Sequence, residues 1–569
     1  MENPKKDQQA QPVDALRLRE FNRILDTYRA GRAATQERVI ASENWWKLRN
    51  GAEDDQGGDA FRSRSAWLHN VIVSKHADGM EAFPQPVILP REPQDREEAR
   101  RLSDIIPCIL ERNHFEDVYS SVLWQKLKTG TGVFKVAWDP CRSGGTGDIA
   151  VEGVSLLNLF WEPGVSDVQN SRYLFHLELC DRDLLQDRYP EADLKSAGSG
   201  QLLSKFLYDD AVDTSGKCAV VEVYYHVGGL LQYCKYVDET LLFASENDPL
   251  YAAFGWYDHG KYPYVFDPLY PIEGSPCGYG YVDLCKNPQT QIDLLNTAFL
   301  ENAMVGAKPR YFTRADANFN RQQFLDTTQP LVDVVGNLDE KSLRRIDYQP
   351  LDGVYMHVLD SSIRELRETS GNTETSTGNI ASGVTAAAAI AALQEASGKT
   401  SRDATRSAYR AYGRVVELCI DLMRQFYLTP RRFRVSGRAS QPEFVLYSNA
   451  GLQPQDQGEE FGVNLGYRSP LFDVRVRAQR QNAYTTLSQN ELALQLFREG
   501  FFHPDLARQA AGCLELMEFE GKDRLQAYLA AQQDSPAPEP LPQRPGTLPP
   551  IPETETQRGE RLHQMAVSP

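Results

Sequence analysis

The sequence predicts an α+β fold in which a strand-rich region lies between two helical regions of the chain. Within residues 125–275, the run from Gly130 to Pro140 alternates apolar and polar side chains before a turn, as a half-buried strand does. Further segments of this kind occupy residues 149–160, 173–179, 219–226 and 230–237. By contrast, residues 385–427 lack proline, and their apolar side chains recur at helical spacing, which is typical of a long amphipathic helix.

The chain before the strand-rich region is predicted to be helical. Residues 14–50 are helical in character and mildly basic, and a Gly/Asp-rich break follows them. A second helix is predicted over residues 61–80, and it should end at a cluster of three prolines, Pro84, Pro86 and Pro90. Residues 94–121 are expected to be mostly helical, with Pro107 as a break or kink, because proline lacks the N–H that a helix interior needs.

Two more helices are predicted after the strands. Asn287-Pro288 is a favourable helix start, because Asn caps free backbone N–H groups and Pro has no N–H to leave unpaired at the first helical position. This helix should stop at Gly306, and its successor should span residues 355–368. The residues between them, 307–350, are expected to form a small compact unit with a strand-like core at 331–335.

Strands and then helices are predicted to complete the folded part of the chain. Ser397-Gly398 interrupts the long helix, and such a pair is a known cause of a kink. Short strands are predicted at residues 432–435, 444–447 and 472–476. Helices are predicted between residues 483 and 530, and the Pro-rich segment 532–569 is predicted to be disordered.

Composition and charge disfavour several classes of protein. The net charge of −17 gives no basic footprint, so the chain either does not meet DNA or contacts it without holding it. The nine cysteines include no C-x-x-C pair, which argues against a zinc site or disulfide framework and fits a reducing cytosol. No secretory signal is expected, because residues 1–11 are polar and charged, and the longest apolar run, 386–393, is far shorter than a membrane span.

No catalytic or metal site is predicted, and we expect neither enzymatic activity nor a cofactor. The segment Gly130-x-Gly132-x-x-Lys135 faintly resembles a kinase glycine-rich loop, but the third glycine and the downstream kinase motifs are missing, so a turn that leads into a strand explains it better. The nine histidines lack metal-ligand spacing, and no pair of carboxylates is distinguished by its setting. A nucleotide-dependent enzyme remains an alternative, which the missing phosphate loop disfavours.

One polar segment, residues 371–384, has an unusual composition. It is rich in Asn, Thr, Ser and Gly and carries a single charge, Glu374. Short hydroxyl and amide side chains can hydrogen-bond to phosphate or water and exchange partners easily, which suits a surface that touches a moving polyanion. An ordinary linker is the alternative, but the segment's position between a helix and the longest helix of the chain disfavours it.

Residues 368–411 resemble the tunnel loop and kinked helix of the portal proteins of tailed bacteriophages. In that family a glycine/polar loop leads into a Thr-Ala-Ala-rich segment and then Leu-Gln-Glu-Ala, which correspond here to residues 383–388 and 393–396. The pattern from Asn287 to Asn296 is similar to the first stem helix of portals. The stretch 130–140, followed by Glu162-Pro163 and Tyr189-Pro190-Glu191, is similar to their wing domain.

The resemblance implies an order of parts that covers most of residues 40–530. The expected parts are an N-terminal helical, partly flexible arm (1–40), a mixed α/β wing (41–285, with returning strands in 428–480), a first stem helix (286–306), a small α/β clip (307–351), a second stem helix (352–370), a tunnel loop (371–384), a long kinked helix (385–427), a helical crown (481–531) and a Pro-rich tail (532–569). The arm and the tail lie outside the resemblance.

The resemblance also implies a function. Copies of the chain would form a ring, a dodecamer in this family, at one capsid vertex, and DNA would be packaged and ejected through its channel. Implied partners are the large terminase subunit, head–tail adaptors, the major capsid and scaffolding proteins, and double-stranded DNA that passes without tight binding; no membrane is implied. The protein would be located in the virion after assembly in the host cytoplasm. A connector of a gene-transfer agent or an internal virion protein is the alternative.

Particular residues are expected to meet the DNA. The tunnel-loop residues that should approach it most closely are Asn372, Thr373, Thr375, Ser376, Thr377 and Asn379. The stem residues that should face the channel are Lys286, Gln291, Arg364 and Arg367. The two arginines can equally form ion pairs with Glu365 and Glu368 on the helix surface. A mostly acidic or neutral lining would let the duplex slide, because each neutralised phosphate adds affinity that the packaging motor must overcome. The helix kink is expected at Ser397 and Gly398.

Overall fold

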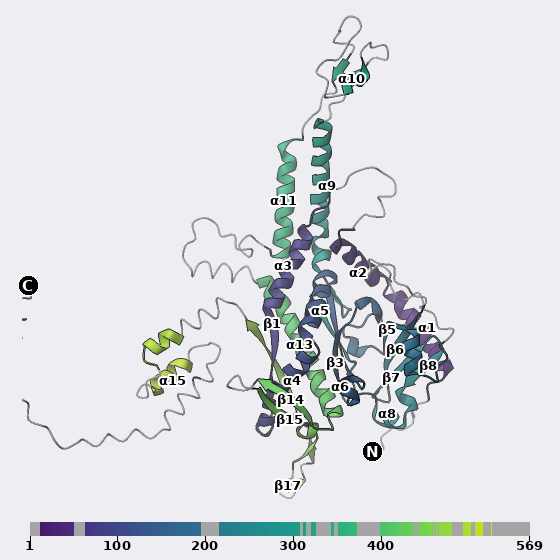
Figure 1. Cartoon of the computed structure of the whole chain (residues 1–569), viewed down its shortest axis with the longest axis vertical. Coiled ribbons are helices and arrows are strands. Elements are labelled where there is room, and N and C mark those ends of the chain that lie inside the picture. Colours follow the sequence, from purple (N-terminus) through teal and green to yellow (C-terminus); the bar gives the residue numbers. More distant parts are fainter. Residues whose placement is uncertain are drawn as a thin grey trace, which may run out of the picture. The chain divides into compact units, whose positions relative to one another are not determined.

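The computed structural model contains helices and antiparallel sheets in the same chain, which confirms the predicted α+β class (Figure 1). The chain divides into two compact units, residues 1–480 and 481–569. The structure describes residues 12–49, 63–194, 216–307, 311–313, 320–325, 343–345, 351–372, 399–436, 442–457, 459–460, 463–464, 466–480, 493–501, 507–515 and 525.

The largest sheet is an antiparallel meander of five strands in the first unit. Its strands are β4 (Leu159–Trp161), β5 (Tyr173–Asp181), β6 (Lys217–Val227), β7 (Leu230–Val237) and β8 (Thr240–Ala244). Helix α1 (Ala15–Gly31) covers one face, where Phe21 contacts Tyr173 and Tyr28 contacts Phe175. Because alternate strand residues point to opposite faces, Leu174 packs into the core on the other side. From residue 12 onwards, the N-terminal region is therefore part of a folded core.

A second sheet of three strands packs between helices. It consists of β3 (Asp148–Gly153), β2 (Thr131–Asp139) and β9 (Tyr264–Pro268), with β2 in the centre. Phe115 of α5 (Phe115–Thr129) stacks on Phe134 of β2 and contacts Tyr412 of α13 (Lys399–Phe426). The prediction of one strand over residues 149–160 was wrong. Ser155 accepts the backbone N–H of Leu157 and turns the chain, so β3 and β4 belong to different sheets.

The predicted break at Pro107 was also wrong. Helix α4 (Arg96–Arg112) continues through Pro107, and the chain turns instead at His114, whose φ of 49° is left-handed. One proline removes one helical N–H, whereas the helix buries Ile105, Ile106 and Ile109 in the main core and is held there. The preceding helices are α2 (Ala33–Trp46) and α3 (Trp67–Glu81), which agree with the helical character predicted for these regions.

The three prolines after α3 lie in a strand that the sequence did not predict. Among the described strands, β1 (Ala82–Pro90) pairs with β20 (Phe472–Arg480) alone, in antiparallel register. The backbone N–H of Ile88 donates to Ser103 Oγ of α4 at 3.0 Å, so the even-numbered residues direct their backbone polar groups away from β20. Pro84, Pro86 and Pro90 share that parity. Their missing N–H groups therefore cost no hydrogen bond between the two strands.

Two long helices, α9 (Tyr281–Ala307) and α11 (Gly353–Ser370), run side by side (Figure 1). The predicted helix start at Asn287-Pro288 was wrong, because α9 begins at Tyr281 and Pro288 is buried inside it. The Gly280 N–H donates to Asp283 Oδ2 at 3.1 Å and so caps the true first turn. Between the two helices the structure describes β12 (Tyr311–Thr313), which pairs with β13 (Leu343–Arg345), and α10 (Arg321–Leu325); residues 331–335 lie outside the described residues.

The remaining elements are short. The predicted strands at 432–435, 444–447 and 472–476 correspond to β14 (Arg431–Ser436), β15 (Pro442–Tyr447) and β20. Short strand pairs are β10 (Tyr270–Pro271) with β11 (Gly278–Tyr279), β16 (Gln455–Asp456) with β19 (Tyr467–Arg468), and β17 (Glu459–Glu460) with β18 (Val463–Asn464). Short helices are α6 (Arg142–Gly145), α7 (Arg182–Arg188) and α8 (Pro249–Phe254). In the second unit, α15 (Ala507–Glu515) buries Ala510 and Leu514.

Candidate functional site

The base of α9 is fixed to the start of α3 by buried polar side chains. Gln289 of α9 accepts the Leu68 N–H at 3.0 Å and donates to the Ser65 carbonyl at 2.9 Å. Asp293, one turn further along α9, accepts from both the N–H and the hydroxyl of Ser65. These contacts satisfy N–H groups at the start of α3, where its own preceding residue supplies no side-chain cap. The direction in which α9 leaves the core is thus set by hydrogen bonds as well as by packing.

Helix α11 returns along α9 through polar contacts spread over its length. Near its start, the Leu351 N–H donates to Asn302 of α9 at 3.4 Å. Further along, the Ser362 hydroxyl donates to Gln291 Oε1 at 3.2 Å. Towards its end, Leu366 is fully buried in the main core. The two helices therefore form an antiparallel pair with one end rooted in the core.

Both described ends of the segment 373–398 lie beside one helix, α3. Before the segment, Asn372 Oδ1 accepts from the Ser74 hydroxyl at 3.4 Å. After it, the Ser401 hydroxyl accepts from Lys75 Nζ at 3.0 Å and donates to Asp78 Oδ2 at 2.9 Å. Residues 74–78 make up about one helical turn. The chain therefore leaves α11 and enters α13 next to the same turn of α3.

A buried ion pair attaches α13 to the sheet. Lys126 Nζ of α5 lies 2.8 Å and 2.9 Å from the two carboxylate oxygens of Asp267 in β9. The same ammonium donates to the Ala404 carbonyl of α13 at 3.2 Å, and the Ser407 hydroxyl of α13 donates to Asp267 at 2.9 Å. Four polar groups from three elements thus satisfy one another around a buried ammonium and carboxylate. Burial also lowers the pKa of the nearby Lys75 ammonium, and Asp78 opposes this shift.

A comparison with protein families shows which family the chain belongs to. A family model described as phage P22-like portal protein matches residues 81–259 and 245–567, which is most of the chain. The chain belongs to this family. As a portal protein it is a structural component of a phage capsid, and the family implies an oligomeric ring with capsid and terminase contacts. No curated protein matches the chain.

The four stem residues predicted for this portal protein occupy different settings. Lys286 is exposed on α9, and Gln291 is exposed where it accepts the hydrogen bond from α11. Arg364 of α11 is exposed and forms no ion pair with any residue that the structure describes. By contrast, the Arg367 guanidinium lies 5.2 Å from the centre of the Trp67 ring of α3, so it is held against the core.

Most of the predicted tunnel-loop residues lie outside the described part of the structure. Asn372 is half-buried beside α3, as given above. Thr373, Thr375, Ser376, Thr377 and Asn379, and the kink residues Ser397 and Gly398, are outside the described residues.

The residues that anchor the two described ends of the segment 373–398 were not predicted from the sequence. Ser74, Lys75 and Asp78 of α3, and Lys126 of α5, are far from residues 371–384 in the chain. In an amphipathic helix, no local sequence pattern distinguishes a lysine that is buried and paired from a lysine that is exposed to solvent. Only the tertiary structure brings these four residues to the two ends of the segment.

None of the helices in the described ranges is long and apolar enough to cross a membrane. Among the same residues, no group of three or more His, Cys, Asp or Glu side chains is arranged to hold a metal ion.

Proposed function

We propose that this portal protein forms the ring through which double-stranded DNA enters and leaves the capsid, with α9 and α11 of every copy lining the channel. The family match is the observation that carries this function. The antiparallel pair α9–α11, rooted at one end in the core, supports the assignment of these helices as the stem. The described strands β12 and β13 and helix α10 then belong to the clip, which we propose as the docking site for terminase and the head–tail adaptors.

Exposed apolar side chains on the two helices support contacts between copies. Eight of them are between 42% and 65% exposed in the single chain: Leu294, Leu300, Met304, Val305, Val354, Tyr355, Met356 and Val358. Apolar surface of this extent on a helical pair indicates a protein–protein contact. In a ring with head-to-tail contacts, the α9–α11 pair of one copy would pack against that of the next and remove these side chains from water.

The charges of the two helices support a channel that does not hold DNA. Helix α9 carries three carboxylates and one lysine, and α11 carries three carboxylates and two arginines. Because Arg367 is held against Trp67, Arg364 and Lys286 are the exposed cations on these two helices. Such a surface offers few phosphate contacts for each copy, and DNA affinity depends on how many phosphates are neutralised. We propose that the duplex slides past these helices.

The polar segment 371–384 is proposed as the constriction of the channel. The described residues before and after it, Asn372 and Ser401, both lie beside one turn of α3 at the core end of α11, which supports this proposal. A loop with short polar side chains at the root of the stem would contact passing DNA through hydroxyl and amide groups.

Electron microscopy of the purified full-length chain tests the ring. Negative-stain images should show ring-shaped particles with a central hole, and mass photometry should give one assembly of many copies. A chain that stays monomeric at micromolar concentration, both alone and with its scaffolding protein, would contradict the proposal. Fluorescence anisotropy with a labelled duplex provides a second test. Assembled rings should bind it weakly at physiological salt, and tight, salt-sensitive binding would contradict the sliding channel.

We also propose that the protein has no enzymatic activity and that terminase supplies the energy for packaging. An ATPase assay on purified rings should show no hydrolysis above the buffer background. Hydrolysis that co-purifies with the ring and that saturates with ATP would contradict this proposal and favour a nucleotide-dependent enzyme.

A further inference from the structure

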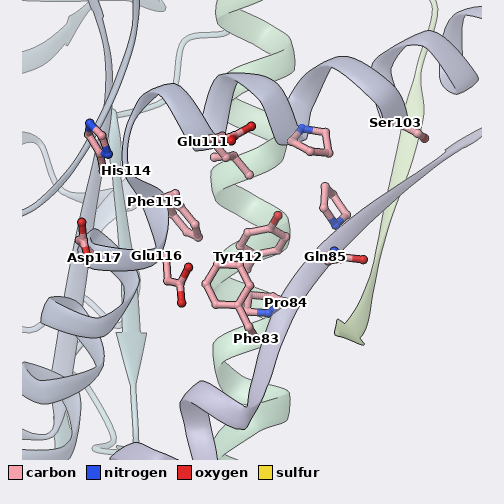
Figure 2. A pocket seen from close by; sticks show the side chains of 13 residues that line it. Phe83, Pro84, Gln85, Ser103, Glu111, His114, Phe115, Glu116, Asp117 and Tyr412 are labelled. Carbon is pink, nitrogen blue, oxygen red and sulfur yellow. The ribbon is translucent and has the colours of Figure 1, made fainter. Parts of the chain in front are cut away.

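A groove lies where β1 passes the corner between α4 and α5 (Figure 2), and none of the described residues that line it belongs to α9 or α11. Its volume is about 450 Å³, a size typical of sites for small ligands or short peptide segments. Phe115 and Tyr412 are buried beneath it, and Phe83 and Leu110 form apolar walls. Figure 2 shows the rings of Phe83, Phe115 and Tyr412 gathered at the centre of the view. The groove therefore offers an apolar surface to an incoming chain.

The rim of the groove is acidic. Glu111 at the end of α4 and Glu116 and Asp117 at the start of α5 are all exposed and line it. None of the three forms an ion pair with a basic residue among those that the structure describes. Among the described residues, none that lines the groove is a lysine or an arginine, although α4 carries arginines and α5 carries lysines elsewhere. The described lining thus has three carboxylates and neither of these cations, which favours a cationic ligand.

The edge of β1 that borders the groove presents acceptors but no donors at two positions. The carbonyl of Ala82 accepts from Tyr409 and the N–H of Ile88 donates to Ser103, so even-numbered residues of β1 face away from β20. Pro84 and Pro86 share this parity and line the groove. Proline has a carbonyl and no N–H, so this edge can only accept hydrogen bonds. Both prolines are buried in the single chain, and a ligand that reaches their carbonyls must supply donors.

A strained residue holds the two halves of the rim together. His114 has φ 49° and ψ 46°, a left-handed backbone that residues with a side chain adopt at an energetic cost. This conformation ends α4 and starts α5 within a few residues, so Glu111 and Glu116 border one groove. Strained backbone of this kind is concentrated at functional sites, which supports a role for the groove.

We propose that this groove binds an extended segment of a partner protein of the phage particle, in which apolar or proline residues alternate with arginine or lysine. The apolar floor would receive the uncharged side chains, and the carboxylates and proline carbonyls would receive the cationic donors. Nucleic acid does not fit, because the three carboxylates repel phosphate. The proposal does not depend on the DNA channel, because it concerns a different surface of the molecule.

A binding assay on the full-length protein tests the proposal. The probe is a fluorescein-labelled peptide, Arg-Pro-Leu-Arg-Pro-Leu-Arg, and its control has glutamate in place of each arginine. The wild-type protein should bind the basic probe, more weakly as salt increases, and should not bind the acidic control. The triple variant Glu111→Gln, Glu116→Gln, Asp117→Asn should bind about tenfold more weakly, since three exposed ion pairs are lost. Glu37→Gln on α2, which is exposed and outside the groove, should bind like the wild type.

A further variant, and a comparison of intact rings with dissociated copies, complete the test. Gln85→Lys adds a cation to the groove wall without removing a core side chain, and it should weaken binding as well. Equal affinity of the wild type and the triple variant would overturn the proposal. So would binding by dissociated copies together with no binding by intact rings, because the groove would then be filled by a second copy of this chain.

Discussion

The buried pair Lys126–Asp267 allows a quantitative test of how α13 is held. The side chains of Lys126 and Asp267 are 1% and 4% exposed, and the ammonium lies within 2.9 Å of both carboxylate oxygens. Replacing Lys126 with Met keeps most of the aliphatic stem and removes the charge. The Asp267 carboxylate then stays buried and keeps the hydrogen bond from the Ser407 hydroxyl, but it has lost its counterion. The Ala404 carbonyl also loses a hydrogen-bond donor.

The expected loss of stability depends on whether the attraction between the two charges or the cost of their desolvation dominates. The attraction between the two charges is opposed by the cost of removing both from water, so the intact pair adds little net stability. Removing one partner is different, because the other charge keeps its desolvation cost without its counterion. Such single substitutions cost about 3–5 kcal/mol. Removing both charges, as in Lys126→Met with Asp267→Leu, should cost much less than the sum of the two single changes.

Hydrogen exchange of α13 is the suitable assay, because unfolding of a chain of 569 residues need not be two-state. A loss of about 3–5 kcal/mol should accelerate exchange of amides around Ala404 and Ser407 by roughly two to four orders of magnitude. The surface pair Arg101–Glu97, whose side chains are 53% and 78% exposed, provides the matched control. Glu97→Gln should change exchange in α4 by no more than about fivefold, and it leaves the ion pair of Arg101 with Glu98 in place. Unchanged exchange in α13 of Lys126→Met, or equal effects of the two substitutions, would refute the reasoning.

Three further predictions concern the loop, the ring and pH. Replacing Thr375, Ser376 and Thr377 with lysine should slow DNA packaging in a motor-driven assay while rings still assemble, because added cations would hold phosphates; an unchanged rate would count against the constriction. Leu294→Asp together with Val358→Asp should shift rings towards monomers in mass photometry. Leu16→Asp should not, although the Leu16 side chain on α1 is also exposed. Intact rings in the double variant would argue against contacts through α9 and α11. Burial lowers the pKa of His259 to about 4, and its Nδ1 accepts the Lys261 N–H. Because the unfolded chain keeps a histidine pKa of about 6.5, stability should fall as pH decreases from about 6.5 towards 4. His259→Asn should flatten this part of the profile of thermal midpoint against pH, and identical profiles would contradict it.

Elements whose side chains follow a clear period were predicted from the sequence. The alternation in residues 173–179, 219–226 and 230–237 corresponds to β5, β6 and β7, and the apolar spacing of Ala408, Ala411 and Val415 corresponds to the buried face of α13. The period of the apolar side chains shows which face of a helix or strand is buried, and this period can be seen within the residues of that element alone. Helix start signals were less reliable. Asn287-Pro288 has the right residue types, yet α9 begins at Tyr281, because packing of the preceding turn against the core extends the helix.

The sequence by itself determined the α+β class, the presence of the long helices, the acidic charge and the resemblance to portal proteins. These features depend on composition and on patterns within single elements. Only the tertiary structure decided that the prolines of β1 face away from β20, that α3 anchors both ends of the segment 373–398, and that Lys126 meets Asp267. Each of these is a pairing between residues far apart in the chain. Such pairings arise because burial brings polar groups together where water cannot satisfy them, and no local pattern records which partner each group will find.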